Sequence, residues 1–70
     1  MTEDVVNLPK HYTNGKIEVL DFILDQDLPY LEANIVKYIC RHRLKNGIED
    51  IQKAEFYIKR LILELENAEI

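Results

Sequence analysis

One stretch of this 70-residue chain establishes its fold, namely residues 29–67, PYLEANIVKYICRHRLKNGIEDIQKAEFYIKRLILELEN. Pro29 suits the first turn of a helix, because its missing N–H would have no partner there anyway, and a helix is predicted over residues 29–45. The dipeptide NG at 46–47 then marks a stop, since both residues tolerate the left-handed conformation that ends helices. A further helix is predicted over residues 48–67, so the two long helices form an antiparallel pair.

The last of these helices carries apolar residues at alternating steps of three and four, which is typical of a coiled-coil-like seam. The seam comprises Ile51, Ala54, Ile58, Leu61 and Leu65, widened by Ile62. Phe56 and Leu63 lie on another side of the same helix, at about 100° per residue. We therefore expect a second packing surface, most simply formed by another copy of the chain in a homo-oligomer; the alternative is that a preceding short helix covers it within a monomer.

That short helix is predicted over residues 17–26. Ile17, Leu20, Ile23 and Leu24 recur at helical spacing, and Asn14 is the best available cap. Residues 1–16 are polar and show no helical period, which indicates an N-terminal arm. The expected architecture is all-α: an arm over 1–16, then a three-helix domain over 17–70.

Composition excludes several classes of protein. The formal net charge is −4 and the isoelectric point is about 5.0, which argues against general nucleic-acid binding, since that depends on neutralising many phosphates. The longest apolar runs are three residues, far below a membrane span or a secretory signal. A single cysteine, Cys40, fits a reducing compartment. We expect a cytoplasmic protein.

Against this acidic background, a basic cluster stands out in the first long helix. Projected at about 100° per residue, it resolves into a polar stripe of an amide, an aromatic ring and three cations: Asn34, Lys37, Tyr38, Arg41 and Lys45. Cations can hold phosphate, a ring can stack on a base and an amide can read a base edge, which are the parts of a nucleotide site. The alternative is an ordinary solvated face with cations near a helix C-terminus. His42 lies off the stripe, and we expect it to pair with an acidic residue of a neighbouring helix.

A second polar stripe flanks the seam of the last helix. Its members are Asp50, Lys53, Tyr57, Arg60 and Glu64. They suit ion pairs between residues four apart, while Lys53 and Tyr57 are also candidates to complete a pocket with the first stripe. In the arm, His11 and Tyr12 are candidates to contact a ligand, although a histidine in such a segment is more often simply solvated.

Three acidic residues are candidate Mg²⁺ ligands if the protein is an enzyme: Glu18, Asp21 and Asp50. The alternative is that they favour helix N-termini through the helix dipole. No phosphate-binding glycine loop, nucleophile elbow or paired-cysteine zinc spacing is present. We therefore expect no obligatory cofactor, with Mg²⁺ reserved for the enzymatic alternative.

Four ordered blocks, PKHY (9–12), GKIEVLDFI (15–23), NIVKYICR (34–41) and EDIQKAEFYIKR (49–60), resemble a small family of tailed-phage proteins of unknown function. The resemblance covers about residues 9–62. It falls on many of the polar positions above, namely His11, Tyr12, Gly15, Glu18, Asp21, Asn34, Lys37, Tyr38, Arg41, Asp50, Lys53, Ala54 and Tyr57. The chain departs from the pattern at Ala33, where the family has glycine, and at His42 and Arg43, where small residues are usual.

The resembled family includes a nucleotide kinase of a coliphage without a recognised ATP-binding motif, which implies nucleotide handling without fixing the reaction. By physical character alone, the chain also looks like small helical phage oligomers that sequester nucleotide messengers of bacterial immunity. The leading expectation is therefore capture of a nucleotide-type signal in the host cytoplasm, without turnover. The alternatives are a nucleotide kinase or Mg²⁺-dependent nucleotide hydrolase, and a helical protein that inhibits a host enzyme through the exposed apolar side of its last helix.

Overall fold

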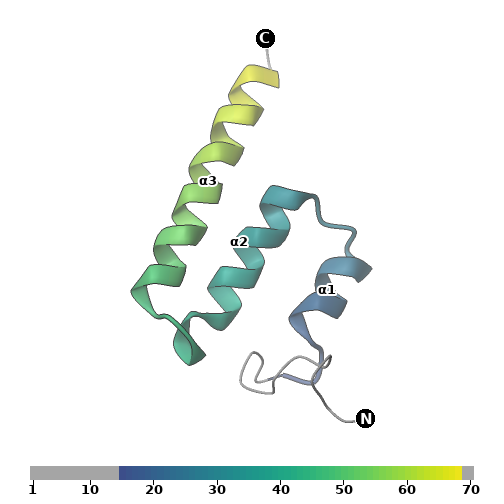
Figure 1. Ribbon diagram of the computed structural model, residues 1–70. Coiled ribbons are helices and arrows are strands. Elements are labelled where there is room, and N and C mark those ends of the chain that lie inside the picture. The colour runs from purple at the N-terminus through teal and green to yellow at the C-terminus, as the bar shows by residue number, and fades with distance from the viewer. Residues whose placement is uncertain (1–14, 69–70) are drawn as a thin grey trace.

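The computed structural model describes residues 15–68 and shows an all-α protein, as predicted (Figure 1). Its elements are α1 (Val19–Asp25), α2 (Tyr30–Arg41), the short 3₁₀-helix η2 (His42–Leu44) and α3 (Ile48–Ala68). The long helices lie close to their predicted positions. The first long helix, however, is α-helical only as far as Arg41, and its last turn tightens into η2.

The turn between α1 and α2 depends on a residue that the sequence did not single out. Asp27 adopts a left-handed conformation with φ of 53°. Its N–H donates to the Leu24 carbonyl at 3.1 Å and the next N–H, of Leu28, donates to Ile23 at 3.1 Å. These two bonds form a Schellman motif, which usually has glycine at the left-handed position. At the other end α1 is capped by Glu18 without a side-chain bond, and the predicted cap, Asn14, lies outside the described residues.

The turn between η2 and α3 follows the predicted NG stop. Gly47 has φ of +58°, and its N–H donates to the His42 carbonyl at 2.8 Å. Asn46 is not left-handed; its backbone and side chain instead donate to Asp50. The reversal makes α2 and α3 antiparallel neighbours.

The three helices lie side by side, with α2 between α1 and α3 (Figure 1). α1 packs on the side of α2 away from α3, so the alternative in which the short helix covers the extra apolar side of α3 is wrong. α3 also continues past the start of α2 into a C-terminal part, and among residues 15–68 no helix lies opposite that part (Figure 1). Within residues 15–68, no helix is both long and apolar enough to cross a membrane.

The contact face of α3 overlaps the predicted seam in part, because the seam residue Ala54 is buried as expected. Among the described residues, only Ala54 and Asp50 are buried. Ile51 and Leu61 are half-buried, whereas Ile58 and Leu65 are exposed although they were expected in the seam. The helix is rotated so that Asp50, Ala54 and Tyr57 approach α2, because polar and aromatic contacts between the two helices fix the rotation.

Candidate ligand-binding site

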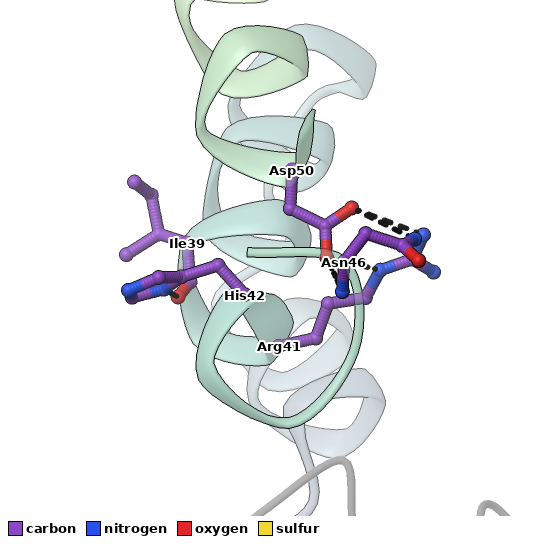
Figure 2. A network of polar contacts seen from close by, with 5 residues as sticks. All are labelled: Ile39, Arg41, His42, Asn46 and Asp50. Carbon is purple, nitrogen blue, oxygen red and sulfur yellow. Dashed lines mark hydrogen bonds and ion pairs between the residues drawn. The ribbon is translucent and has the colours of Figure 1, made fainter. Parts of the chain in front are cut away.

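A buried ion pair joins the end of α2 to the start of α3. Arg41 Nε lies 3.1 Å from Asp50 Oδ2, and Arg41 Nη2 lies 3.2 Å from Asp50 Oδ1. The Asn46 N–H and side-chain amide add donors at 3.2 and 3.4 Å, so four contacts converge on one carboxylate (Figure 2). Asp50 is 0% exposed. This network is the main polar connection between the two long helices.

The pKa of Asp50 follows from these contacts. Burial by itself would raise the pKa of the carboxyl, because it disfavours the charged form. The hydrogen bonds from Arg41 and Asn46, together with the charge of Arg41, outweigh burial and hold the pKa below its ordinary value. Asp50 is therefore ionised at neutral pH and is stabilised by its partners.

Beside the ion pair, three cations surround the ring of Tyr38. The distances from its centroid are 4.8 Å to Lys37 Nζ, 4.9 Å to Arg41 Cζ and 5.4 Å to Lys53 Nζ. All three lie within the roughly 6 Å at which a cation is attracted to an aromatic face. The Tyr38 ring is parallel to that of Tyr57, with centroids 6.0 Å apart and planes at 8°. We call these five residues, from α2 and α3, the cation–aromatic cluster.

Tyr57 also belongs to an open groove next to the cluster, of about 540 Å³. Edge-to-face contacts place the Tyr30 ring 6.2 Å and the Phe56 ring 5.3 Å from that of Tyr57. A hydrogen bond with Tyr30, burial and the neighbouring tyrosines raise the pKa of Tyr57, so its phenol remains neutral at physiological pH. The groove is lined by Pro29, Tyr30, Leu31, Glu32, Phe56, Tyr57, Arg60, Leu61 and Glu64.

The structure thus brings together five of the predicted site residues: Lys37, Tyr38, Arg41, Lys53 and Tyr57. Arg41, however, is committed to Asp50 by two of its nitrogen atoms. Tyr38 and Arg41 point toward α3 rather than forming a solvated stripe of α2. Two of the five residues of the first polar stripe, Tyr38 and Arg41, therefore belong to the helix–helix contact, whereas Lys37 remains exposed.

The remaining candidates lie outside the cluster. Asn34 donates from Nδ2 to the Tyr30 carbonyl of its own helix at 2.9 Å. Lys45 lies in the turn between η2 and α3, at the opposite end of the hairpin from the groove (Figure 1). His11 and Tyr12 lie outside the described residues.

The three candidate Mg²⁺ ligands are not brought together. Glu18 and Asp21 lie at the start of α1, while Asp50 lies between α2 and α3 with its oxygens bound to Arg41 and Asn46. Over residues 15–68, no three His, Cys, Asp or Glu side chains are grouped so that they could hold a metal ion.

Two further predictions about polar contacts have definite outcomes. His42 does not pair with an acid: its Nδ1 lies 2.6 Å from the Ile39 carbonyl, to which it donates (Figure 2). In the second stripe, Arg60 and Glu64 form the expected ion pair at 3.1 Å. Asp50 was expected in that same stripe and is instead the most deeply buried polar residue described.

The sequence did not single out Tyr30 and Phe56 as groove residues. A signal for Tyr30 was present, because Tyr30, Asn34 and Tyr38 are spaced by four and so share one face of a helix. Phe56 had been assigned to an apolar packing surface. It is 65% exposed, and it flanks Tyr57 at the groove.

Comparison with known proteins gives the family of the chain. No curated protein and no solved structure matches it. A family model, described as a protein of unknown function, matches residues 6–59. That match spans most of the chain, including the ion pair, the cation–aromatic cluster and part of the groove, and the protein therefore belongs to the DUF3310 family.

Proposed function

We propose that this protein captures a small nucleotide, with its phosphate at the cation–aromatic cluster and its base in the adjoining groove. The observation that carries the proposal is that lysines from two different helices approach one tyrosine ring beside an aromatic groove. Each part of such a ligand has a matching part in this arrangement.

The phosphate is assigned to Lys37 and Lys53. Both side chains lie on exposed positions, and both ammonium groups are within 5.4 Å of the Tyr38 centroid. Their positive charges repel each other, and an anion between them relieves that repulsion. Ammonium groups bind phosphate as point charges. Arg41 serves to position Tyr38 and to pair with Asp50.

The base is assigned to the groove. Its volume of about 540 Å³ falls within the roughly 300 to 1,000 Å³ of small-molecule sites. Tyr30 and Phe56 present exposed rings there, and stacking on an aromatic side chain is worth about 1 to 3 kcal/mol per base. The carboxylates of Glu32 and Glu64 are acceptors for the amino groups of a base.

The proposed role is sequestration without turnover. The resemblance to phage proteins makes the nucleotide messengers of bacterial antiviral immunity the first ligands to test. Enzymatic conversion of a nucleotide and inhibition of a host protein are the competing outcomes. The experiment that follows separates capture from conversion, and a chain that binds no nucleotide would leave inhibition of a host protein as the remaining candidate.

The test is a thermal-shift screen of the full chain against mono-, di- and cyclic nucleotides, with nucleosides and inorganic phosphate as partial ligands. It is run with and without Mg²⁺, and bound ligand is identified after the protein is denatured. We expect a shift with at least one nucleotide, a smaller shift with its nucleoside or with phosphate, and recovery of unchanged ligand. Recovery of a converted ligand would replace capture with catalysis, and no shift with any nucleotide would reject the proposed function.

A matched pair of lysine variants tests the phosphate position. Lys53→Gln removes a charge from the cluster, whereas Lys59→Gln removes one from the same helix at a position paired with Glu55 at 3.5 Å. One charge-assisted contact is worth about 1.5 to 3 kcal/mol, so Lys53→Gln should weaken Kd roughly ten- to a hundredfold. Lys59→Gln should leave Kd within about twofold. Equal effects of the two variants would show a general charge effect and remove the cluster from the site.

A further inference from the structure

One side of the α2–α3 hairpin is aliphatic, and it is not the side of the proposed site. Take as reference the direction in which the two helices contact each other, through Tyr38 and Arg41 of α2 and Asp50 and Tyr57 of α3. At about 100° per residue, Lys37, Lys53 and Phe56 lie about 60 to 120° to one side. About 60 to 140° to the other side lie Ile35, Ile39, Ile51, Ile58, Ile62 and Leu65, which we call the aliphatic face.

The two helices present their halves of this face to the same side. In an antiparallel pair of right-handed helices, residues that lie at the same angle from the line joining the two helices point to the same side of the pair. The close-up agrees, because Ile39 points away from the Arg41–Asp50 network (Figure 2). The aliphatic face is thus continuous across the hairpin, and Ile39, Ile58, Ile62 and Leu65 are exposed on it.

This face is where the missing core of the protein should lie. In residues 15–68 only Ala54 and Asp50 are buried, so the hairpin itself encloses almost no apolar side chain. Small domains are marginally stable even with a complete core, and they commonly gain stability by oligomerisation. A partner that covers the aliphatic face would supply the apolar burial that the single chain lacks.

We propose that the aliphatic face packs against the same face of a second copy of the chain, related by a two-fold axis. Two helical hairpins joined in this way form a four-helix bundle. The face is self-complementary, because it is aliphatic over both helices. Two glutamates lie at its margin: Glu55 is paired with Lys59 on the same helix, and Glu32 lines the groove at the start of α2. If the fold depends on a partner at this face, a second copy of the chain is favoured as that partner, because another copy is present wherever the chain is made.

The size of the face also favours a second copy over the N-terminal segment. The helices are about 31 Å (α3) and 18 Å (α2) long, and with a helix diameter of about 10 Å they present a face of roughly 500 Å² in projection. The solvent-accessible area of this face is larger than its projected area, because side chains make the surface uneven. Stable interfaces bury about 800 Å² per partner. Residues 1–14 contain only two valines and one leucine as aliphatic side chains, which is too few to cover six aliphatic positions.

The arrangement leaves the proposed ligand site accessible, because the cation–aromatic cluster and Phe56 lie on the opposite side of the hairpin. Assembly and ligand binding are therefore separable. A dimer that binds no nucleotide would reject the proposed function alone, and a nucleotide-binding monomer would reject the proposed interface alone.

Adjacent residues of α3 supply a matched test. Ile62 is 49% exposed on the aliphatic face, and Leu63 is 52% exposed on another side of the helix. Sedimentation equilibrium of the full chain should give twice the 8.3 kDa mass of one chain. We expect Ile62→Glu to halve the mass or to unfold the protein, and Leu63→Glu to retain both the dimer mass and the Tm.

If the Ile62→Glu variant unfolds, the concentration dependence of Tm of the wild-type chain still tests the proposed dimer. Unfolding of a dimer is coupled to dissociation, so Tm should rise with each tenfold increase in protein concentration. A folded monomer whose Tm is independent of concentration would overturn the proposal. So would an oligomer that both glutamate variants leave intact.

Discussion

At the scale of single residues, Asp50 makes the most consequential contacts in the structure. Its carboxylate accepts hydrogen bonds from Arg41 of α2 and from Asn46 of the preceding turn, and it is fully buried between the long helices. A buried ion pair is not in itself a large source of stability, because desolvation offsets the attraction between the charges. Removal of one partner is nevertheless costly, since the other charge is left without compensation.

The substitution Asp50→Asn should therefore destabilise the protein strongly. It removes the negative charge opposite Arg41 and replaces an acceptor of the Asn46 N–H with a competing donor. Loss of one partner of a buried pair costs about 3 to 5 kcal/mol, and we expect a value near the lower end because Arg41 is partly exposed. Urea unfolding measures the change. The control is Glu49→Gln at the exposed neighbouring position, with an expected change below about 0.5 kcal/mol.

The same residue predicts a pH dependence of stability. The pKa of Asp50 is lower in the folded protein than its ordinary value of 3.8. The folded state therefore gains from ionisation, and this contribution is complete above about pH 4 and is lost as pH falls through the folded-state pKa. The difference in unfolding free energy between wild type and Asp50→Asn should be constant from pH 5 to 7 and shrink below about pH 4. A difference that grows on acidification would contradict the assignment.

At the scale of elements, two left-handed residues set the directions of the helices. Asp27 follows the end of α1 and Gly47 is the last residue of the turn before α3, with φ of 53° and 58°. Glycine adopts this conformation without a steric cost, whereas residues with a Cβ atom generally do not. The hairpin of α2 and α3 therefore depends on the glycine at position 47.

The substitution Gly47→Ala should cost about 1 kcal/mol. No atom lies within 4 Å of a Cβ atom built at this position, so the cost comes from the backbone conformation alone. Gly15→Ala is the matched control, because its Cβ atom would also meet open space and its φ is not left-handed. Chemical unfolding should show a loss for the first variant and almost none for the second. Equal losses of unfolding free energy in the two variants would show that the left-handed conformation of Gly47 is not the cause.

At the scale of the whole molecule, the two sides of the hairpin differ in chemistry, and each carries one of the two proposed functions. One side carries the cations, tyrosines and groove, and the other carries the aliphatic face. The helix–helix contact between them is polar and aromatic, which leaves the aliphatic face exposed in a single chain. The proposed dimer would bury this face and so compensate for the small number of buried apolar residues within one chain.

Ligand binding should consequently stabilise the assembly without changing its size. At a free nucleotide concentration of about a hundred times Kd, the folded state gains about 2.7 kcal/mol. For a chain of this size that corresponds to a rise in Tm of roughly 10 °C or more. Light scattering with and without the nucleotide should give the same mass. A change of mass on binding would show that ligand and assembly use a common surface.

The positions of the helices and the residues of the cluster follow from local patterns in the sequence. Apolar spacing predicted three helices, and the NG dipeptide placed the turn, because both are local properties of the chain. Lys37, Tyr38 and Arg41 were found by helical spacing, and Lys53 and Tyr57 were proposed to face them. The Schellman turn at Asp27 was missed, because aspartate is uncommon at a position that glycine usually occupies.

The rotation of each helix about its axis, by contrast, depends on contacts between helices and could not be predicted from spacing. Spacing identifies the sides of a helix but does not say which side another helix will contact. Of the predicted seam, Ala54 is buried and Ile51 and Leu61 are half-buried, but Ile58 and Leu65 are exposed, and Asp50 and Tyr57 contact α2 beside Ala54. The physical reason is that Arg41 and Asp50 satisfy each other only when they meet between the helices. Their pairing and the parallel stack of Tyr38 on Tyr57 turn the aliphatic residues outward.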